Sequence, residues 1–235
     1  MIWRDGPISE ELSVYIEGLG ERGEFVYIDG SEENRGIAPS YNSLISVALE
    51  MGYRYIARMD SDDICTPDRI EKQYRFMKEN PDIDVVGGYI REFSEDGSYD
   101  KIVKYPREHE EMFRFFAKRV PIANVTSFFS ATFFSKAGLY PEESPTNEDT
   151  LMWLKGFRRG CRFANIDSVA VEVRVDGGFF GRRGGLGKAL SDFGDRAKVI
   201  RTLGYGPGAW LYATALFLVA MSPGFLKKIL YERFR

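Results

Sequence analysis

The stretch Tyr55-Ile-Ala-Arg-Met-Asp60-Ser-Asp62-Asp63-Ile64 decides how this 235-residue chain folds. It begins as a strand, because Tyr55 and Ile56 favour extended backbone. It ends in three carboxylates within four residues. Pro67 then marks the start of a helix, since apolar residues recur at helical spacing over residues 68–77. The acidic groups therefore follow the carboxyl end of a strand, which is the edge where α/β sheets bind ligands.

The three carboxylates Asp60, Asp62 and Asp63 predict a cation site. Like charges so close together repel and raise one another's pKa, unless a cation shares the site. Hard carboxylate oxygens suit Mg²⁺ or Mn²⁺, which bind one or two carboxylates together with substrate phosphates. The alternative is a solvated acidic turn that caps the following helix, because Asp is favoured at such positions.

The composition is that of one globular domain, or of a domain with a tail. The hydrophobic content of 44% allows a real core. The net charge of -3 shows no sign of the basic face that a nucleic-acid binder carries. Residues 1–5 lack the apolar region of a signal peptide, so we expect the catalytic part to be cytoplasmic.

Strands and helices alternate along the chain, which predicts a three-layer α/β sandwich with a mixed, mainly parallel sheet. The predicted helices are 9–18, 40–51, 68–77, 109–119 and 148–159, and the predicted strands are 25–28, 53–59, 83–90, 161–166 and 168–175. His109 is the only histidine and lies in a charged run. We therefore expect it on the surface, without a catalytic role.

A second acidic pair, Glu148 and Asp149, falls in the first turn of the helix predicted over 148–159. Acidic residues at that position favour the helix dipole, which explains the pair without any function. The functional interpretation is a general base, because a carboxylate at a helix N-terminus can face the carboxyl edge of the sheet and accept a proton.

Two arginines, Arg182 and Arg183, lie within the glycine-rich segment 177–185. Such a loop can close over a diphosphate, because it supplies backbone donors and positive charge. A surface linker is the alternative. Earlier in the chain, Arg35 and Gly36 precede the helix predicted over 40–51. A helix N-terminus favours an anion, and the guanidinium of Arg35 suits phosphate oxygens.

The tail has a different composition from the rest of the chain. Residues 202–226 contain no charged side chain, and residues 209–221 are strongly apolar. The apolar core is shorter than the ~20 residues that a membrane-spanning helix needs. Residues 225–235 are basic and amphipathic, which is typical of an interfacial helix. We expect a helical hairpin over residues 205–235 on the cytoplasmic membrane surface. The alternatives are a helix packed on the domain, a dimer contact or a true span.

Three ordered motifs now point to a family. They are Ala57-Arg-Met-Asp-Ser-Asp-Asp-Ile, Pro67-x-Arg69-Ile-Glu-Lys-Gln73 and Asn80-Pro-x-Ile-Asp-Val-Val-Gly87. Together they resemble the family 2 glycosyltransferases of the GT-A fold, above all the bacterial enzymes of capsule, exopolysaccharide and lipopolysaccharide assembly. The resemblance runs from Asp5-Gly-Pro to about Arg183. Relative to that family, the chain is expected to lack one N-terminal βα unit.

The resemblance also implies roles for individual residues. Asp60 and Asp62 would bracket the ribose, the metal and the diphosphate of the donor, with Asp62 as the direct metal ligand. Asp149 would be the general base. Asp5 would lie near the uracil by its position, and Arg35 along the nucleotide-sugar site. Arg182 and Arg183 would belong to a mobile basic loop near the leaving nucleotide.

The implied function is an inverting glycosyltransferase that moves a sugar from a UDP-sugar to a glycan or lipid-linked acceptor, with Mn²⁺ or Mg²⁺. Residues 1–200 would form the GT-A domain and residues 201–235 the membrane-associated tail. Two other functions stay open. One is a catalytically inactive binding or scaffold protein, and the other is a metal-dependent nucleotidyltransferase. The reaction products distinguish the three.

Overall fold

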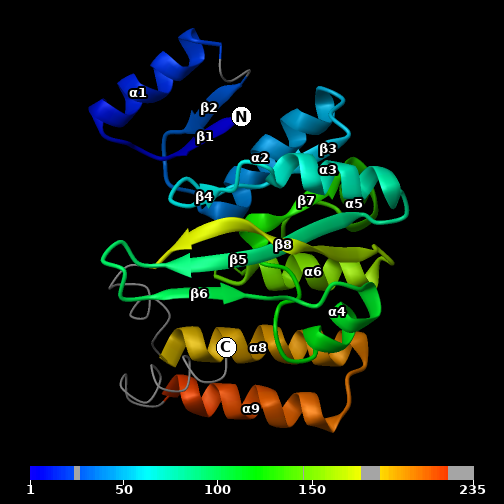
Figure 1. Ribbon diagram of the computed structural model, residues 1–235. Coiled ribbons are helices and arrows are strands. Elements are labelled where there is room, and N and C mark those ends of the chain that lie inside the picture. The colour runs from blue at the N-terminus through cyan, green and yellow to red at the C-terminus, as the bar shows by residue number, and fades with distance from the viewer. Residues whose placement is uncertain (24–26, 145, 176–185, 222–235) are drawn as a thin grey trace.

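The computed structural model describes residues 1–23, 27–144, 146–175 and 186–221 (Figure 1). The helices are α1 Glu10–Glu21, α2 Ile37–Glu50, α3 Arg69–Glu79, α4 His109–Phe116, η1 Asn124–Thr126, α5 Ala131–Ala137, α6 Glu148–Arg158, α8 Leu186–Leu203 and α9 Pro207–Met221. The strands are β1 Ile2–Asp5, β2 Ile28–Ser31, β3 Tyr55–Ala57, β4 Ile64–Cys65, β5 Val85–Phe93, β6 Asp100–Val103, β7 Phe128–Ser130 and β8 Phe163–Arg174.

The described strands form two sheets. The strands β1 and β2 pair in parallel by themselves, beside α1 (Figure 1). The other six strands form one sheet in the order β3-β7-β5-β8-β4, with β6 paired to β5. This sheet is mixed, as predicted, but β5 and β8 are its one parallel pair among the described strands. It is more antiparallel than expected, because short connections such as the turn between β5 and β6 can only join antiparallel neighbours.

Alternate residues of the central strands face two different cores. The larger core contains Val85 of β5, Phe129 of β7 and Phe163 of β8. The residue next to each of these in sequence packs in the smaller core on the opposite face, as the period of two in a strand requires (Val86, Phe128 and Ala164). Helix α3 contributes to the smaller core, whereas α2, α4, α5, α6 and α8 contribute to the larger one.

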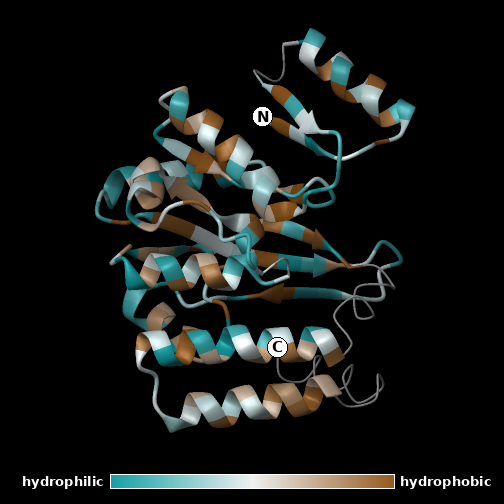
Figure 2. Cartoon of the chain, turned by 180° about the vertical axis from the view of Figure 1, so that it is seen from behind, coloured by the Kyte–Doolittle hydropathy of each residue, from teal (hydrophilic) through white to brown (hydrophobic). Residues whose placement is uncertain are grey.

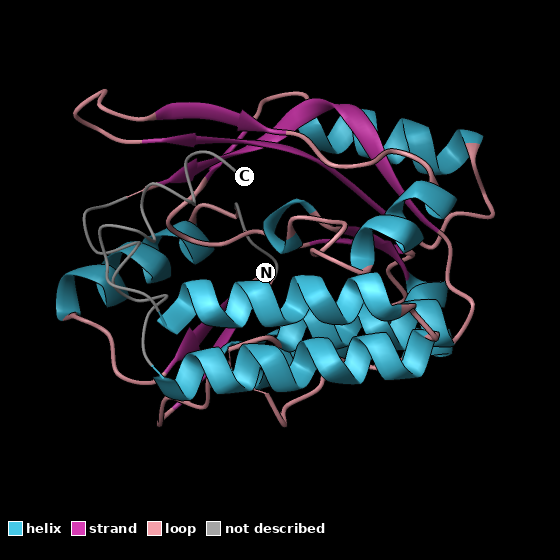
Figure 3. Cartoon of the chain, turned by 90° about the horizontal axis from the view of Figure 1, so that it is seen from below, coloured by secondary structure: helices cyan, strands magenta, loops and turns pink. Residues whose placement is uncertain are grey.

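Helix α6 lies between the sheet and the C-terminal helices. It is buried on nearly all sides, with Trp153 and Met152 at 0% exposure. Helix α8 packs against α6, and α9 packs against α8. Figure 3 shows α8 and α9 side by side. No described helix is both long enough and apolar enough to cross a membrane.

Several predictions from the sequence need correction. The strands expected over 161–166 and 168–175 are one strand, β8, because it pairs along its length with β5 through an irregular register. The strand expected over 25–28 starts at Ile28, and residues 24–26 lie outside the described residues. His109, which was expected on the surface, is half-buried. Its Nδ1 accepts the backbone N–H of Phe163 at 3.2 Å. The expected domain boundary at residue 200 falls inside α8, and the division into two domains stays a prediction. The helix expected over residues 225–235 lies outside the described residues.

Two buried polar side chains of α3 bind backbone carbonyls at β5, at η1 and just after β3. Arg69 is 1% exposed and Gln73 is 0% exposed. The Nη2 of Arg69 donates to the carbonyl of Arg58 at 2.8 Å, and Gln73 Nε2 donates to the carbonyls of Val86 at 3.2 Å and Thr126 at 2.7 Å. The two side chains are also joined, through Arg69 Nε and Gln73 Oε1 at 3.0 Å. Residues four apart share a helix face, so α3 can fix the strand end that precedes the acidic residues.

We expect Gln73→Leu to lower the free energy of unfolding by about 2–4 kcal/mol. The substitution keeps the size of the side chain but leaves two buried carbonyls and the Nε of Arg69 without their partner. Urea denaturation measures the change. The control is Lys72→Ala on the exposed side of α3, which breaks only a surface ion pair with Asp68 and should cost less than about 1 kcal/mol. Equal stabilities of the two variants would contradict the role of Gln73.

Candidate active site

The acidic residues lie on the turn that joins β3 to β4. Asp60 is half-buried and Asp62 is exposed. Asp63 is held against the end of β8, because its Oδ1 accepts the backbone N–H of Arg174 at 3.3 Å. Burial raises the pKa of Asp63 to about 6, and the charges of Asp62 and Asp60 add to the rise. Asp60 and Asp62 are therefore the two acidic residues of the turn whose oxygens face a ligand most readily.

One oxygen of Asp60 is already engaged. Its Oδ1 lies 2.9 Å from Nη2 of Arg58 and accepts the hydroxyl of Tyr41 at 2.5 Å. Arg58 is only 8% exposed, and its guanidinium lies 4.4 Å from the centre of the Tyr41 ring. Arg58 is thus a cation built into the acidic turn, and it offsets part of the repulsion between the carboxylates.

Carboxylate oxygens such as those of Asp60 and Asp62 are the ligand type that small, hard divalent cations prefer. Within the described ranges, no group of three or more His, Cys, Asp or Glu side chains gathers into a metal cluster. The turn can therefore supply one or two carboxylates. Mg²⁺ and Mn²⁺ sites of this kind complete their coordination with substrate phosphates and water.

The carboxylate of Asp5 accepts hydrogen bonds from the backbone just before α2. Its Oδ1 accepts the backbone N–H of Arg35 at 2.7 Å, and its Oδ2 accepts that of Gly36 at 2.9 Å. Gly36 has a φ of 91° and directly precedes α2, so the carboxylate caps a turn that a larger residue would strain. The side chain of Arg35 is exposed. Asp5 and Arg35 are therefore neighbours at the N-terminus of α2, a contact that the sequence did not predict.

Glu148 and Asp149 open α6, as predicted. Glu148 is buried, and Asp149 is half-buried with its Oδ1 bound to the backbone N–H of Thr150 at 2.5 Å. Burial raises the pKa of Asp149, and it raises the pKa of Glu148 to about 7. The charge of Arg58 lowers both pKa values in part, and the charge of Asp60 raises that of Glu148. The pair is therefore within electrostatic reach of the acidic turn.

Helix α8 holds the start of α6 in place. The Nδ2 of Asn147, which precedes α6, donates to Asp192 at 2.8 Å and to Asp195 at 2.9 Å. The hydroxyl of Ser144 donates to Asp195 as well, at 2.9 Å. The C-terminal part of the chain thus helps to position the second acidic pair.

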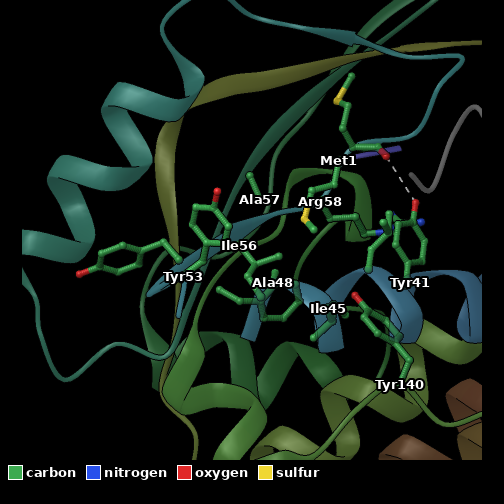
Figure 4. Close-up of a pocket in the computed structure, with 13 residues that line it drawn as sticks. Met1, Tyr41, Ile45, Ala48, Tyr53, Ile56, Ala57, Arg58 and Tyr140 are labelled. Carbon is green, nitrogen blue, oxygen red and sulfur yellow. Dashed lines mark hydrogen bonds between the residues drawn. The ribbon is translucent and has the colours of Figure 1, made fainter. Parts of the chain in front are cut away.

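A cavity of about 390 Å³ lies next to the acidic turn (Figure 4). Met1 borders it from the side of β1, and the residues of β3 border it from the other sheet. Tyr41, Arg58 and Tyr140 give it a polar end near Asp60, while the remaining lining is mainly apolar (Leu44, Ile45, Ala48, Tyr53, Tyr55, Ile56, Ala57, Met59 and Phe129). The cavity therefore lies between Met1 and the residues of β3, and two of its lining residues, Tyr41 and Arg58, contact Asp60.

The structure places Asp60 within electrostatic reach of Glu148, which adjoins Asp149, whereas Arg182 and Arg183 lie outside the described residues. Sequence reasoning missed two residues that contact Asp60, namely Arg58 and Tyr41. A signal was present for Arg58: an arginine inside a strand-forming stretch is rarely buried unless it is paired. No signal in the sequence pointed to Tyr41, because its contact with Asp60 joins residues that are 19 positions apart.

Comparisons with known proteins show which family this sequence resembles. The family described as "Glycosyl transferase family 2" matches residues 4–137. An uncharacterized glycosyltransferase of Haemophilus influenzae is 32% identical over 68% of this chain, which spans 58% of that relative's length. The amylovoran biosynthesis glycosyltransferase AmsE of Erwinia amylovora is 27% identical over 98% of the chain and 85% of the relative.

A third relative is the UDP-Gal:alpha-D-GlcNAc-diphosphoundecaprenol beta-1,3-galactosyltransferase of Escherichia coli. It is 27% identical over 82% of this chain and 68% of its own length. Among solved structures, the mannosyltransferase PcManGT of Pyrobaculum calidifontis, in complex with GDP-Man and Mn²⁺, matches 98% of this chain and 69% of its own. Its TM-score is 0.58 at 14% identity. S. aureus TarS with UDP-GlcNAc has a TM-score of 0.56 at 17% identity, over 86% of this chain and 60% of its own.

These likenesses to solved structures identify the fold as that of the GT-A glycosyltransferases. The family match covers more than half of the chain, and it includes the acidic turn and the start of α2. This protein therefore belongs to glycosyl transferase family 2.

Proposed function

We propose that this chain is an inverting glycosyltransferase that moves a sugar from a UDP-sugar to a glycan or lipid-linked acceptor in surface polysaccharide biosynthesis. The observation that carries the proposal is the electrostatic coupling between two groups of acids. The charge of Asp60 raises the pKa of Glu148, and the buried cation Arg58 contacts Asp60 and lowers the pKa values of both Glu148 and Asp149 in part. One group suits a donor diphosphate with its metal, and the other suits an acceptor hydroxyl.

The names of related proteins support the choice of substrates. The Escherichia coli relative is named for UDP-Gal as donor and for a diphosphoundecaprenol-linked acceptor. The Erwinia amylovora relative is named for amylovoran biosynthesis. TarS has been solved with UDP-GlcNAc. We therefore choose UDP over other nucleotides for the donor and a membrane-linked glycan for the acceptor.

On the donor side, Asp62 and the Oδ2 of Asp60 would hold Mn²⁺ or Mg²⁺. A divalent cation there would stabilise the negative charge that develops on the leaving diphosphate. Asp5 and Arg35 would line the nucleotide side at the N-terminus of α2, and Arg182 and Arg183 would approach the diphosphate. These donor-side roles are part of the proposal.

On the acceptor side, Asp149 would be the general base. The acceptor hydroxyl oxygen forms a bond to the anomeric carbon while the bond from that carbon to the diphosphate oxygen breaks. The hydroxyl proton passes to the Asp149 carboxylate. The products are a glycoside of inverted configuration and a free nucleoside diphosphate. The raised pKa of Asp149 suits this role, because it makes the carboxylate a stronger base.

The apolar tail would hold the enzyme at a membrane surface, close to a lipid-linked acceptor. Leu211 and Leu218 of α9 are 73% and 63% exposed. Figure 2 shows hydrophobic residues along α9, at the outer edge of the molecule. Helix α9 carries no charged residue, so a lipid surface can receive its exposed side without burying a charge.

We expect Asp62→Ala to weaken Mn²⁺-dependent binding of UDP by at least about tenfold, because one charged metal ligand is lost. Calorimetry of UDP with Mn²⁺ and with EDTA measures the loss. The control is Asp68→Ala, which removes a nearby exposed acid that forms an ion pair with Lys72. UDP binding that depends on neither Mn²⁺ nor Asp62 would overturn the assignment of the acidic turn to the donor site.

We expect Asp149→Asn to lower the turnover number by about 10²–10⁴ and to leave the affinity for UDP unchanged. Burial raises the pKa of Asp149, so the unsubstituted enzyme should gain activity as the pH rises through that raised value. The assay measures free nucleoside diphosphate together with transferred sugar. The control is Glu143→Gln, an exposed acid that precedes the pair and contacts Lys198. Full activity in Asp149→Asn would contradict the base assignment, and pyrophosphate as product would indicate a nucleotidyltransferase.

We expect the double variant Leu211→Lys/Leu218→Lys to lose most of its sedimentation with anionic phospholipid vesicles. Each lysine places a charge in a side of α9 that would otherwise enter the lipid. The control is Val14→Lys/Tyr15→Lys on α1, where the two side chains are 64% and 60% exposed. Unchanged sedimentation would contradict membrane contact through α9. A change in molecular mass by analytical ultracentrifugation would assign the surface to a dimer instead.

A further inference from the structure

Asp60 is oriented by two side chains that the proposed reaction does not otherwise use. Arg58 and Tyr41 both contact its Oδ1, at 2.9 Å and 2.5 Å. The Oδ2 of Asp60 has no such partner among the described residues. We propose that Tyr41 and Arg58 are positioning residues of the donor site, which hold Oδ1 so that Oδ2 is presented to the metal and diphosphate. This inference rests on the proposed function, because it needs a donor at Asp60.

An aspartate needs such support if it is to hold a metal in a defined geometry. The last torsion of its side chain has a broad, roughly two-fold energy profile, so a free carboxylate turns easily. A site that binds through one oxygen therefore depends on neighbours that lock the other. Two contacts to the same oxygen, from different directions, remove that freedom.

The two residues come from elements that are themselves fixed. The backbone of Arg58 is anchored on both sides, since its N–H donates to Ser127 at 2.9 Å and its carbonyl accepts Arg69 at 2.8 Å. Tyr41 belongs to α2, and its ring lies under the Arg58 guanidinium and 5.9 Å from the ring of Tyr140. Tyr140 is in turn held by Asn124, at 2.8 Å. The support for Asp60 therefore extends back into α2 and η1.

The space around Oδ1 of Asp60 is confined. Arg58 is 8% exposed, and the Tyr41 hydroxyl also lies 3.5 Å from the backbone carbonyl of Met59. Arg58 reaches Asp60 through Nη2, whereas its buried Nε has no hydrogen-bond partner among the described residues.

The decisive experiment is a double-mutant cycle between Tyr41 and Asp60, read by calorimetry of UDP in the presence of Mn²⁺. Tyr41→Phe keeps the ring beneath Arg58 and removes only the hydroxyl bound to Asp60. We expect it to raise the Kd for UDP by about five- to tenfold. In the Asp60→Ala background the same substitution should change the Kd less than about twofold, because Tyr41 would have nothing left to position. The effect should also vanish in EDTA, where no metal needs the oriented oxygen.

The matched control is Tyr205→Phe, which removes another half-buried hydroxyl but one that donates to the backbone carbonyl of Phe113 in α4 instead of to Asp60. It should leave the Kd within about twofold of the unsubstituted chain, although it removes a hydrogen bond of similar strength. Thermal unfolding shows whether either variant has lost its fold. Arg58→Lys, which keeps the charge but not the planar fork, should behave as Tyr41→Phe does.

The outcomes separate this inference from the function beneath it. Equal losses from Tyr41→Phe in both backgrounds would overturn the inference, because Tyr41 would then act independently of Asp60. Metal-dependent binding that needs Asp62 but not Tyr41 would also overturn the inference and leave the proposed function standing. An unsubstituted chain that binds neither UDP nor GDP with Mn²⁺ would overturn both.

Discussion

Buried positive charge at the end of β3 is the constraint on which the site depends. Two arginines meet there and serve different groups. Arg69, from α3, binds the backbone carbonyl of Arg58, whereas Arg58 binds the side chain of Asp60. A buried guanidinium is costly unless it is paired and hydrogen-bonded, so neither side chain can be moved independently of the strand end. The acidic turn thus begins from a fixed point, although Asp62 itself is exposed.

The layers of the fold explain why the second acidic pair is equally well placed. Helix α6 is packed on the sheet on one side and against α8 on the other, so its first residues cannot shift along the sheet. Gly156 lets α6 approach β8 closely, because a Cβ there would lie 2.6 Å from the ring of Phe163. Asn147 ties the helix start to Asp192 and Asp195 of α8. Packing therefore fixes the position of Glu148 and Asp149 at the start of α6.

Burial also controls the chemistry available at this edge. Carboxylates that lose water become harder to ionise, so the pKa values of Glu148 and Asp149 rise. Arg58 limits the rise in both, because its charge favours their ionised forms. A single buried cation therefore acts on the proposed donor side by direct contact and on the proposed acceptor side through its field. This shared dependence is the physical reason to treat the two acidic groups as one site.

The sequence by itself determined the family, the order of the main elements and the identity of the acidic groups. These depend on local properties, namely β-forming residues before Asp60, helical periodicity after Pro67 and an acidic first turn at Glu148. Only the tertiary structure decided what surrounds them. The contacts of Tyr41 with Asp60, Gln73 with Thr126 and Asp5 with Gly36 join residues 19, 53 and 31 positions apart. The side-chain type alone cannot reveal such partners, because burial and hydrogen bonding depend on packing between distant elements. For the same reason the sequence placed His109 on the surface and divided β8 in two, whereas long-range pairing with β5 and the aromatic core determined both.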